Sequence, residues 1–235
     1  MYEEIEHDKE GRERSQAFRQ FLKWFSRMGS KDGRVKYPPR LLDELHPWER
    51  DYVEAMVYEK LMNSKSHAFY AFYFAELFPH LKNYKGIKAL KQYIKDHDDE
   101  SPHVMVVAPV LYETTSKLKY LYLLMRLYRQ SRHIESDSIS IIGRCKPRRT
   151  LFKALAYIFV KDDDLINRRR AGYYMLQHKG YDTKGFDAGG KLSEDEMKLK
   201  WLFLTDKTRE RRRLVKKLAT GQPLIEGVPA PESLG

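Results

Sequence analysis

Short segments with helical periodicity, separated by regular breaks, run through almost the whole of this 235-residue sequence. Apolar residues recur every three or four positions, which places them on one face of an α-helix. In the first segment, about 15–28, this face holds Phe18, Phe21, Leu22 and Phe25. Glycine, proline and charged runs then interrupt the periodicity. The pattern predicts an all-α protein built from many short helices.

The expected helices form an N-terminal helix, a second helix and then repeated helix–turn–helix pairs. Pro47 and Pro102 each stand in a predicted first turn, where proline is well tolerated. The predicted helices cover residues 15–28, 46–62, 66–78, 84–96, 102–115, 117–130, 149–159, 164–178 and, as one long final helix, 193–219. Two consecutive pairs match at offsets of about 31 to 36 residues, which is typical of stacked helical repeats. No convincing strand pattern appears, and the best candidate, the stretch 138–142, is short.

These patterns divide the chain into three regions. Residues 1–30 carry an N-terminal amphipathic helix, and residues 40–219 form a helical-repeat domain. The stretch GSKDGRVKYPP, residues 29–39, separates them with glycine and proline. The tail at 220–235 has three prolines and no periodicity, which predicts disorder.

Two parts of the sequence resemble the HEAT family of helical repeats. The pair YAFYFAEL (70–77) and NYKGIKALKQYI (83–94) is similar to the two helices of such a repeat, the second of which reads roughly AIPAL. DDDLINRRRAGYYML (162–176) resembles the acidic turn of the family followed by V-R-x-x-A-A. Arg168 matches the arginine of that motif, and Ala171-Gly172 match its two small residues.

The resemblance covers about residues 47–178 and departs from the family at two places. Asn167 stands where the family prefers valine, and the Tyr173-Tyr174 pair is bulkier than usual. The resemblance implies an architecture, a right-handed α-solenoid of HEAT-like helix pairs with an extra N-terminal helix and a long C-terminal helix. Many bacterial proteins of this type are adaptors, toxin-neutralising partners or nucleic-acid binders, so the architecture alone does not define an activity.

The formal net charge of +11 is concentrated in one part of the chain. Residues 144–217 hold 21 Lys and Arg against 10 Asp and Glu, whereas the remaining residues hold 23 of each. Such asymmetry indicates an acidic partner for this part: nucleic acid, an acidic protein or an anionic surface.

The run Arg168–Arg170 lies inside a predicted helix and does not form one common phosphate clamp. Successive helical residues are about 100° apart, so three consecutive arginines spread over about 200° of the circumference. Arg168 and Arg169 border the apolar face, where their stems cover apolar surface. Asp164, four residues before Arg168, suits an ion pair along the helix. Only Arg170 is expected to remain available to a partner.

Two other basic clusters are better candidates for binding. GRCKPRR (143–149) lies in a loop between repeats, and such loops gather along one rim of a solenoid. KTRERRRLVKK (207–217) has seven bases in eleven residues, more than a helix dipole requires. It closes a helix that begins with a Ser193–Glu196 capping box. Dense positive charge of this kind attracts polyanions, although no motif of a known nucleic-acid-reading module accompanies it.

No motif in the sequence supports catalysis, a cofactor or a metal site. GFDAGGKL (185–192) matches G-x-x-x-x-G-K, but Leu192 replaces the hydroxyl residue that binds Mg²⁺, and no strand precedes it. DHDDESPH (96–103) has no zinc-type spacing. No Ser-His-Asp or Cys-His arrangement can be assembled. We therefore expect a protein that is not an enzyme, with no cofactor.

The sequence also predicts a cytoplasmic protein that does not bind membranes. A single cysteine, Cys145, excludes an internal disulfide and is typical of a reducing compartment. No stretch approaches the ~20 apolar residues that a membrane-spanning helix needs. The polar N-terminus has no signal peptide.

Together these features predict a non-enzymatic interaction scaffold that binds a macromolecule through its basic C-terminal third. Another protein, for example an acidic toxin, is the leading candidate for the partner, and DNA or RNA is the alternative. The expected contact residues are Arg144, Lys146, Arg148, Arg149, Arg170, Arg211, Arg212 and Arg213. The sequence does not specify the oligomeric state, nor whether the two basic clusters share one face.

Overall fold

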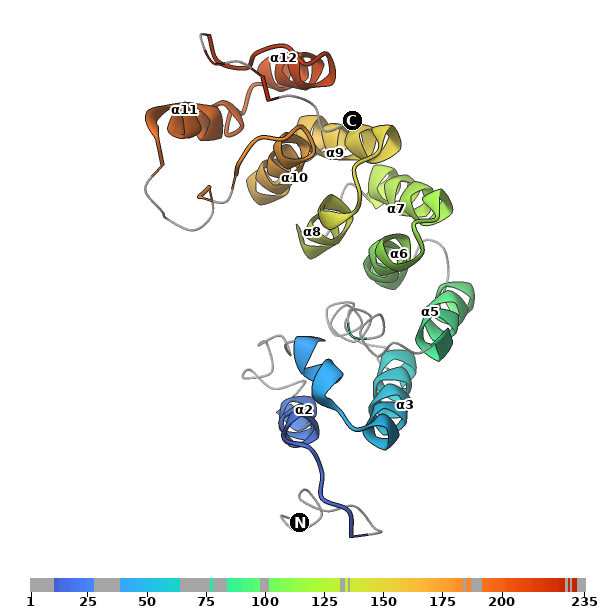
Figure 1. Ribbon diagram of the computed structural model, residues 1–235. Helices are drawn as coiled ribbons and strands as arrows, with labels where there is room; N and C mark the ends of the chain where they lie inside the picture. Colours follow the sequence, from blue (N-terminus) through green and yellow to red (C-terminus); the bar gives the residue numbers. More distant parts are fainter. Residues whose placement is uncertain are drawn as a thin grey trace. The chain divides into compact units, whose positions relative to one another are not determined.

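The computed structural model describes residues 11–27, 39–63, 77, 84–97, 102–131, 134, 136–183, 185–186, 192–226, 228 and 230–231. The regular elements among these residues are all helices, so the prediction of an all-α protein is confirmed for them (Figure 1). The predicted helix at 66–78 lies outside the described residues except for Leu77.

The chain divides into two compact units, residues 1–115 and 116–235. The boundary falls inside the 40–219 stretch that the sequence treats as one helical-repeat domain. The first unit holds 18 basic and 19 acidic residues, whereas the second holds 26 basic and 14 acidic residues. The positive charge of the protein therefore belongs to the second unit.

The first unit contains four described α-helices and one short 3-10 helix. They are α2 (Gln16–Arg27), η2 (Pro39–Glu44), α3 (Pro47–Asn63), α5 (Tyr84–Asp96) and α6 (Pro102–Thr115). Helix α2 contacts η2, α3 contacts α5, and α5 contacts α6. The predicted starts at Pro47 and Pro102 are confirmed.

The buried carboxylate of Glu49 connects the starts of α2 and α3. It accepts hydrogen bonds from the backbone N–H and the hydroxyl of Ser15, both at 2.7 Å, and from the backbone N–H of His46 at 2.8 Å. The Ser15 hydroxyl in turn accepts a hydrogen bond from the N–H of Phe18 at 3.1 Å. Since the N-terminus of a helix carries partial positive charge, both helix starts stabilise this one carboxylate.

The second unit contains six described helices. They are α7 (Leu118–Ser131), α8 (Ser136–Arg144), α9 (Arg149–Lys161), α10 (Leu165–Gln177), α11 (Glu194–Leu202) and α12 (Thr208–Ala219). Helix α10 packs against both α8 and α9, and α9 also contacts α7 and α12. The stretch 138–142, the best candidate for a strand in a sequence without a convincing strand pattern, lies in α8. Its buried positions are spaced as on one helix face: Ser138, Ile139, Ile141 and Ile142.

Two glycines allow α10 to approach its neighbours closely. A Cβ atom at Gly143, in α8, would overlap the ring of Tyr174. A Cβ atom at Gly172, in α10, would lie 2.6 Å from the ring of Phe203, closer than real Cβ atoms come to another atom. The Phe203 ring stacks on Phe159 with the ring centroids 5.1 Å apart. The small residues at these positions are therefore required by packing.

The prediction of one long helix at 193–219 is wrong, because α11 and α12 are separate helices. The chain leaves the α-helical path at Phe203 and resumes it at Thr208. This break buries the Phe203 side chain and brings Asp206 to Arg168. The break thus depends on tertiary contacts, which local periodicity does not report.

Candidate binding groove on the second unit

A groove of about 840 Å³, here named the α9 groove, runs along α9. Two rows of side chains from this helix line it. The first row, here named the basic row, consists of Arg149, Lys153, Tyr157 and Lys161, of which all but Tyr157 are cations. The second, named the apolar row, consists of Phe152, Ala156 and Val160. The other lining residues are Pro147, Arg148, His178, Lys179, Val215 and Ala219. The described lining thus contains five Lys and Arg side chains and no carboxylate.

The members of the basic row are four residues apart. Each therefore lies about 6 Å along the helix axis from the next. Among the described residues, no carboxylate forms an ion pair with Arg149, Lys153 or Lys161. Like charges four residues apart lower helix stability by about 0.2–0.5 kcal/mol for each pair. The row contains one such pair, Arg149 and Lys153, which has no neutralising carboxylate in the described part of the chain, whereas Lys161 lies in the last turn, where the helix dipole favours a cation.

The start of α9 is also unusually basic. Arg148 occupies the N-cap position and makes no side-chain capping hydrogen bond, and the first turn of the helix has no acidic residue. Helix starts favour Ser, Thr, Asp or Asn as caps and negative charge nearby. Instead, the Arg148 guanidinium donates a hydrogen bond to the carbonyl oxygen of Ser116 at 3.2 Å. Neither capping nor the helix dipole therefore explains why Arg148 and Arg149 stand at the start of this helix.

The two aromatic rings of the groove already have partners. The ammonium group of Lys179 lies 5.5 Å from the ring centroid of Phe152. The guanidinium of Arg129 lies 5.1 Å from the ring centroid of Tyr157, and Tyr128 meets that ring edge-on at 6.0 Å. These cation–π contacts hold further positive charge beside the groove and occupy ring surface.

His178, directly after α10, contributes polar surface without charge. Its Nε2 lies 2.7 Å from the carbonyl oxygen of Gly143, and because a carbonyl only accepts, Nε2 carries the hydrogen. Burial lowers the pKa of His178 from its ordinary value of 6.5, and the hydrogen bond to Gly143 opposes this shift. The imidazole is therefore neutral at pH 7, and the charge of the groove comes from lysine and arginine.

Of the predicted contact residues, Arg148 and Arg149 line the α9 groove. Arg213 lines a different hollow. The predicted residues that are exposed and line neither site are Arg144, Lys146 and Arg212. Neither of these two hollows is thus lined by bases of both clusters in the part of the chain that the structure describes.

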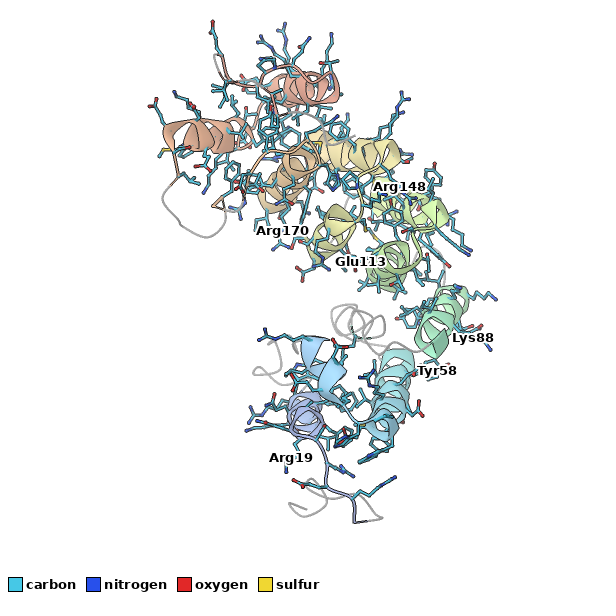
Figure 2. The ribbon with its side chains drawn as sticks, viewed as in Figure 1. Arg19, Tyr58, Lys88, Glu113, Arg148 and Arg170 are labelled. Atoms are coloured by element: carbon cyan, nitrogen blue, oxygen red, sulfur yellow. The ribbon has the colours of Figure 1, made fainter. Side chains whose placement is uncertain are left out.

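The expectation that Arg170 remains available is wrong. Its guanidinium pairs with the Asp137 carboxylate of α8 at 3.1 Å and donates to the Ser140 hydroxyl at 2.8 Å. Figure 2 shows Arg170 on α10 near α8, whereas Arg148 lies by the start of α9. Arg211 is likewise not a surface cation, because its side chain is buried at 5% exposure and donates to Thr208 at 3.0 Å.

The structural role expected of Arg168 is confirmed, although its acidic partner differs from the prediction. The side chain is buried and donates hydrogen bonds to the carbonyl oxygens of Asp162, at 3.3 Å, and Asp163, at 2.9 Å. It also forms an ion pair with Asp206. Asp164, the expected partner, instead caps the start of α10.

Arg213 lines a second hollow of about 710 Å³ between α11 and α12. Lys198 and Lys217 also line it, with the exposed indole of Trp201 and the buried side chain of Leu224 from the C-terminal tail. A carboxylate, Glu210, lies in the same lining and pairs with Lys207 at 3.2 Å. The mixed charge of this hollow distinguishes it from the α9 groove.

The first unit has a smaller hollow of about 360 Å³ between α3 and α5. Tyr58 of α3 and Lys88 of α5 line it, and both side chains are labelled in Figure 2. Asp51 and Glu54 line it as well, so its charge is mixed. Only the α9 groove combines a high density of cations with an apolar wall among these three sites.

Three cations of the groove, Lys153, Lys161 and Lys179, are not among the contact residues predicted from the sequence. Lys153 was detectable, since it stands four residues after Arg149 inside the predicted helix 149–159, whereas Lys161 lies just beyond the predicted end of that helix. Lys179 could not be found in this way, because its place beside Phe152 depends on how the end of α10 meets α9.

Comparisons with known proteins gave no match: no family model, curated protein or solved structure is similar to this chain. None of the helices that the structure describes combines the length and the apolar character needed to cross a membrane. Within the same residues, no group of three or more His, Cys, Asp or Glu side chains is placed to hold a metal ion.

Proposed function

We propose that this protein is a non-enzymatic binding scaffold whose α9 groove receives an acidic segment of another protein. The observation that carries the proposal is the basic row, in which Arg149, Lys153 and Lys161 line one groove without a carboxylate partner among the described residues. Uncompensated like charges lower helix stability, so a complementary negative surface would recover what the isolated helix loses.

The apolar row favours a protein over nucleic acid as the partner. Phe152, Ala156 and Val160 lie directly beside the bases and offer surface that a phosphate backbone cannot use. Proteins that bind single strands stack bases on aromatic ring faces, but one face of Phe152 and one face of Tyr157 are occupied by the cations of Lys179 and Arg129. An acidic polypeptide with apolar side chains matches both rows. Nucleic acid bound by the same cations is the alternative.

The proposal includes a helical-repeat architecture of the HEAT type arranged as a right-handed α-solenoid. Its support is local to the second unit. Helices α9 and α10 pack as a pair across the short turn 162–164, and Arg168, at the position of the family's arginine, links that turn to Asp206. Repeats of this kind present extended surfaces to macromolecules rather than enclosed catalytic sites.

The test compares three labelled probes with the full-length protein by fluorescence anisotropy: poly-L-glutamate, a short DNA duplex and a single-stranded RNA. The double variant Lys153→Gln/Lys161→Gln removes two charges of the groove. Arg209→Gln/Lys216→Gln removes two exposed charges of α12 outside the groove and serves as the matched control. We expect poly-L-glutamate affinity to fall about tenfold in the groove variant, equivalent to about 1.4 kcal/mol. The control variant should bind like the wild type.

Two results would overturn the protein-binding assignment. Equal losses in the groove variant and the control would show that only net charge matters. Tighter binding of either nucleic acid, with a log–log salt slope near −0.9 per phosphate neutralised on the duplex, would support the alternative instead.

A further inference from the structure

The two rows of α9 have the geometry of a helix-packing surface. Side chains at a spacing of four form ridges on a helix, and the space between two such ridges is a groove. Here the basic row, from Arg149 to Lys161, is one ridge and the apolar row, from Phe152 to Val160, is the other. The commonest mode of helix packing places the corresponding ridge of a second helix into a groove of this type.

The small residues of the groove allow a helix to come close. Ala156 is the central member of the apolar row and projects only a methyl group. Val215 and Ala219, also four residues apart, extend the apolar wall from α12. A narrow ridge of the partner therefore has room between α9 and α12.

The apolar wall also disfavours an extended peptide. An extended chain has to satisfy its backbone N–H and C=O groups with an outside partner. The walls of the α9 groove are helices, whose backbone groups are largely used within them, and the wall residues Phe152, Ala156 and Val160 have no polar side-chain atoms. A helical segment satisfies its own backbone hydrogen bonds and can bury apolar side chains there.

We infer that the partner segment is an amphipathic α-helix with carboxylates at every fourth residue beside a row of apolar side chains. This inference rests on the proposed function and specifies its ligand. Because both helices rise about 1.5 Å per residue, a carboxylate series at a spacing of four matches the spacing of the basic row, in which three members are the cations Arg149, Lys153 and Lys161 and the fourth is Tyr157. The basic row spans 12 residue steps, or about 18 Å along the axis of α9, which is the length of roughly three to four turns of a partner helix.

The inference is tested with two labelled peptides of identical composition and the full-length protein. In the patterned peptide, Glu recurs at every fourth position and Leu forms the neighbouring row. In the permuted peptide, the same residues are ordered so that Glu is distributed around the helix. We expect the patterned peptide to bind at least tenfold more tightly, and its circular dichroism to become more helical on binding.

Two groove variants identify the site that the patterned peptide occupies. Ala156→Glu places a negative charge and bulk on the half-buried wall, whereas Ala156→Gln adds similar bulk without charge. We expect the glutamate variant to lose at least tenfold affinity and the glutamine variant to lose less. Amide hydrogen exchange of α9 in both variants checks that the helix is retained.

The outcomes separate this inference from the proposed function. If both peptides bind equally and both lose affinity in Lys153→Gln/Lys161→Gln, the groove binds acidic protein but the helical partner is wrong. If the patterned peptide binds without becoming helical, the helical partner is also wrong. If neither peptide is sensitive to the groove variants, the proposed function itself fails.

Discussion

Helices α9 and α10 are packed neighbours of equal length, 13 residues each, and both carry arginine near their starts. In α10 the arginine charge has partners within the fold, because Arg168 is buried against backbone carbonyl groups and pairs with Asp206. In α9, Arg149 is exposed and has no carboxylate partner among the described residues. The same residue type thus stabilises the fold in one helix and leaves charge for a partner in the other.

The caps of the two helices show the same difference. The Asp164 carboxylate accepts hydrogen bonds from the N–H groups of Ile166, at 2.6 Å, and Asn167, at 3.1 Å, at the start of α10. Arg148 makes no such bond at the start of α9. The start of α10 is therefore optimised for stability, whereas the start of α9 is not, which is typical of a surface retained for binding.

The largest effect is expected for Arg168→Met. The methionine keeps most of the apolar stem but leaves the carbonyl groups of Asp162 and Asp163 without their donor, so the free energy of unfolding should fall by about 2–3 kcal/mol. Urea denaturation followed by circular dichroism measures the change, and amide hydrogen exchange locates it in α10. Arg149→Met is the matched control and should change stability by less than about 0.5 kcal/mol. Equal losses in the two variants would remove the distinction between the helices.

A smaller loss is expected for Asp164→Ala, which removes the cap of α10. Loss of a capping carboxylate lowers stability by about 1 kcal/mol. The same denaturation experiment measures it, and Asp163→Ala, at a neighbouring exposed position without a capping role, is the control. An unchanged midpoint for Asp164→Ala would mean that this cap contributes nothing.

Arg148→Asp is expected to raise the free energy of unfolding, whereas Arg168→Met and Asp164→Ala lower it. An aspartate at this N-cap should stabilise α9 by up to about 1 kcal/mol, because it supplies both an acceptor and a favourable charge. The same variant should weaken the binding of poly-L-glutamate, since it reverses a charge of the groove. Arg148→Gln removes the charge without adding a carboxylate cap and separates the two effects. A loss of stability in Arg148→Asp would show that the bond to Ser116 outweighs the cap.

The smallest expected effect is the change in the free energy of unfolding with pH that His178 causes. Burial lowers its pKa below the ordinary value of 6.5, so the unfolded chain binds the proton more readily than the folded one. The contribution of His178 to stability is therefore complete above pH 6.5 and is lost as the pH falls below it. Denaturation midpoints between neutral and mildly acidic pH measure this slope. His178→Gln should flatten it, and an unaltered slope would assign the pH dependence to other groups.

The parts of the fold that were predictable are those with local signals. The bounds of α5 and α6 match the prediction, and the capping box of Ser193 and Glu196 is present at the start of α11. The break before α12 was not predictable, because it depends on Phe203 reaching Phe159 and Gly172. Periodicity reports which face of a helix is apolar, but it does not report what that face meets.

The candidate site was predicted only in part, for a related reason. Within the dense arginine runs at 168–170 and 211–213, Arg170 and Arg211 were predicted to be available to a partner. In the structure, however, Arg211 is buried and Arg170 pairs with Asp137, 33 residues earlier in the chain. The basic row of α9 is sparse in sequence, since its members are separated by apolar residues. Its charges come together only when the folded helix brings Lys153 and Lys161 to the same groove as Arg149.

The contact between Gly143 and Tyr174 has a consequence for the entropy of binding. The missing side chain at Gly143 admits the tyrosine ring, and its carbonyl oxygen holds His178, so the end of α8 is fixed to the end of α10. Only residues 145–148 connect α8 to α9, and the last of them, Arg148, donates a hydrogen bond to the carbonyl oxygen of Ser116. The groove is thus preorganised, and an incoming segment would bear most of the ordering cost itself.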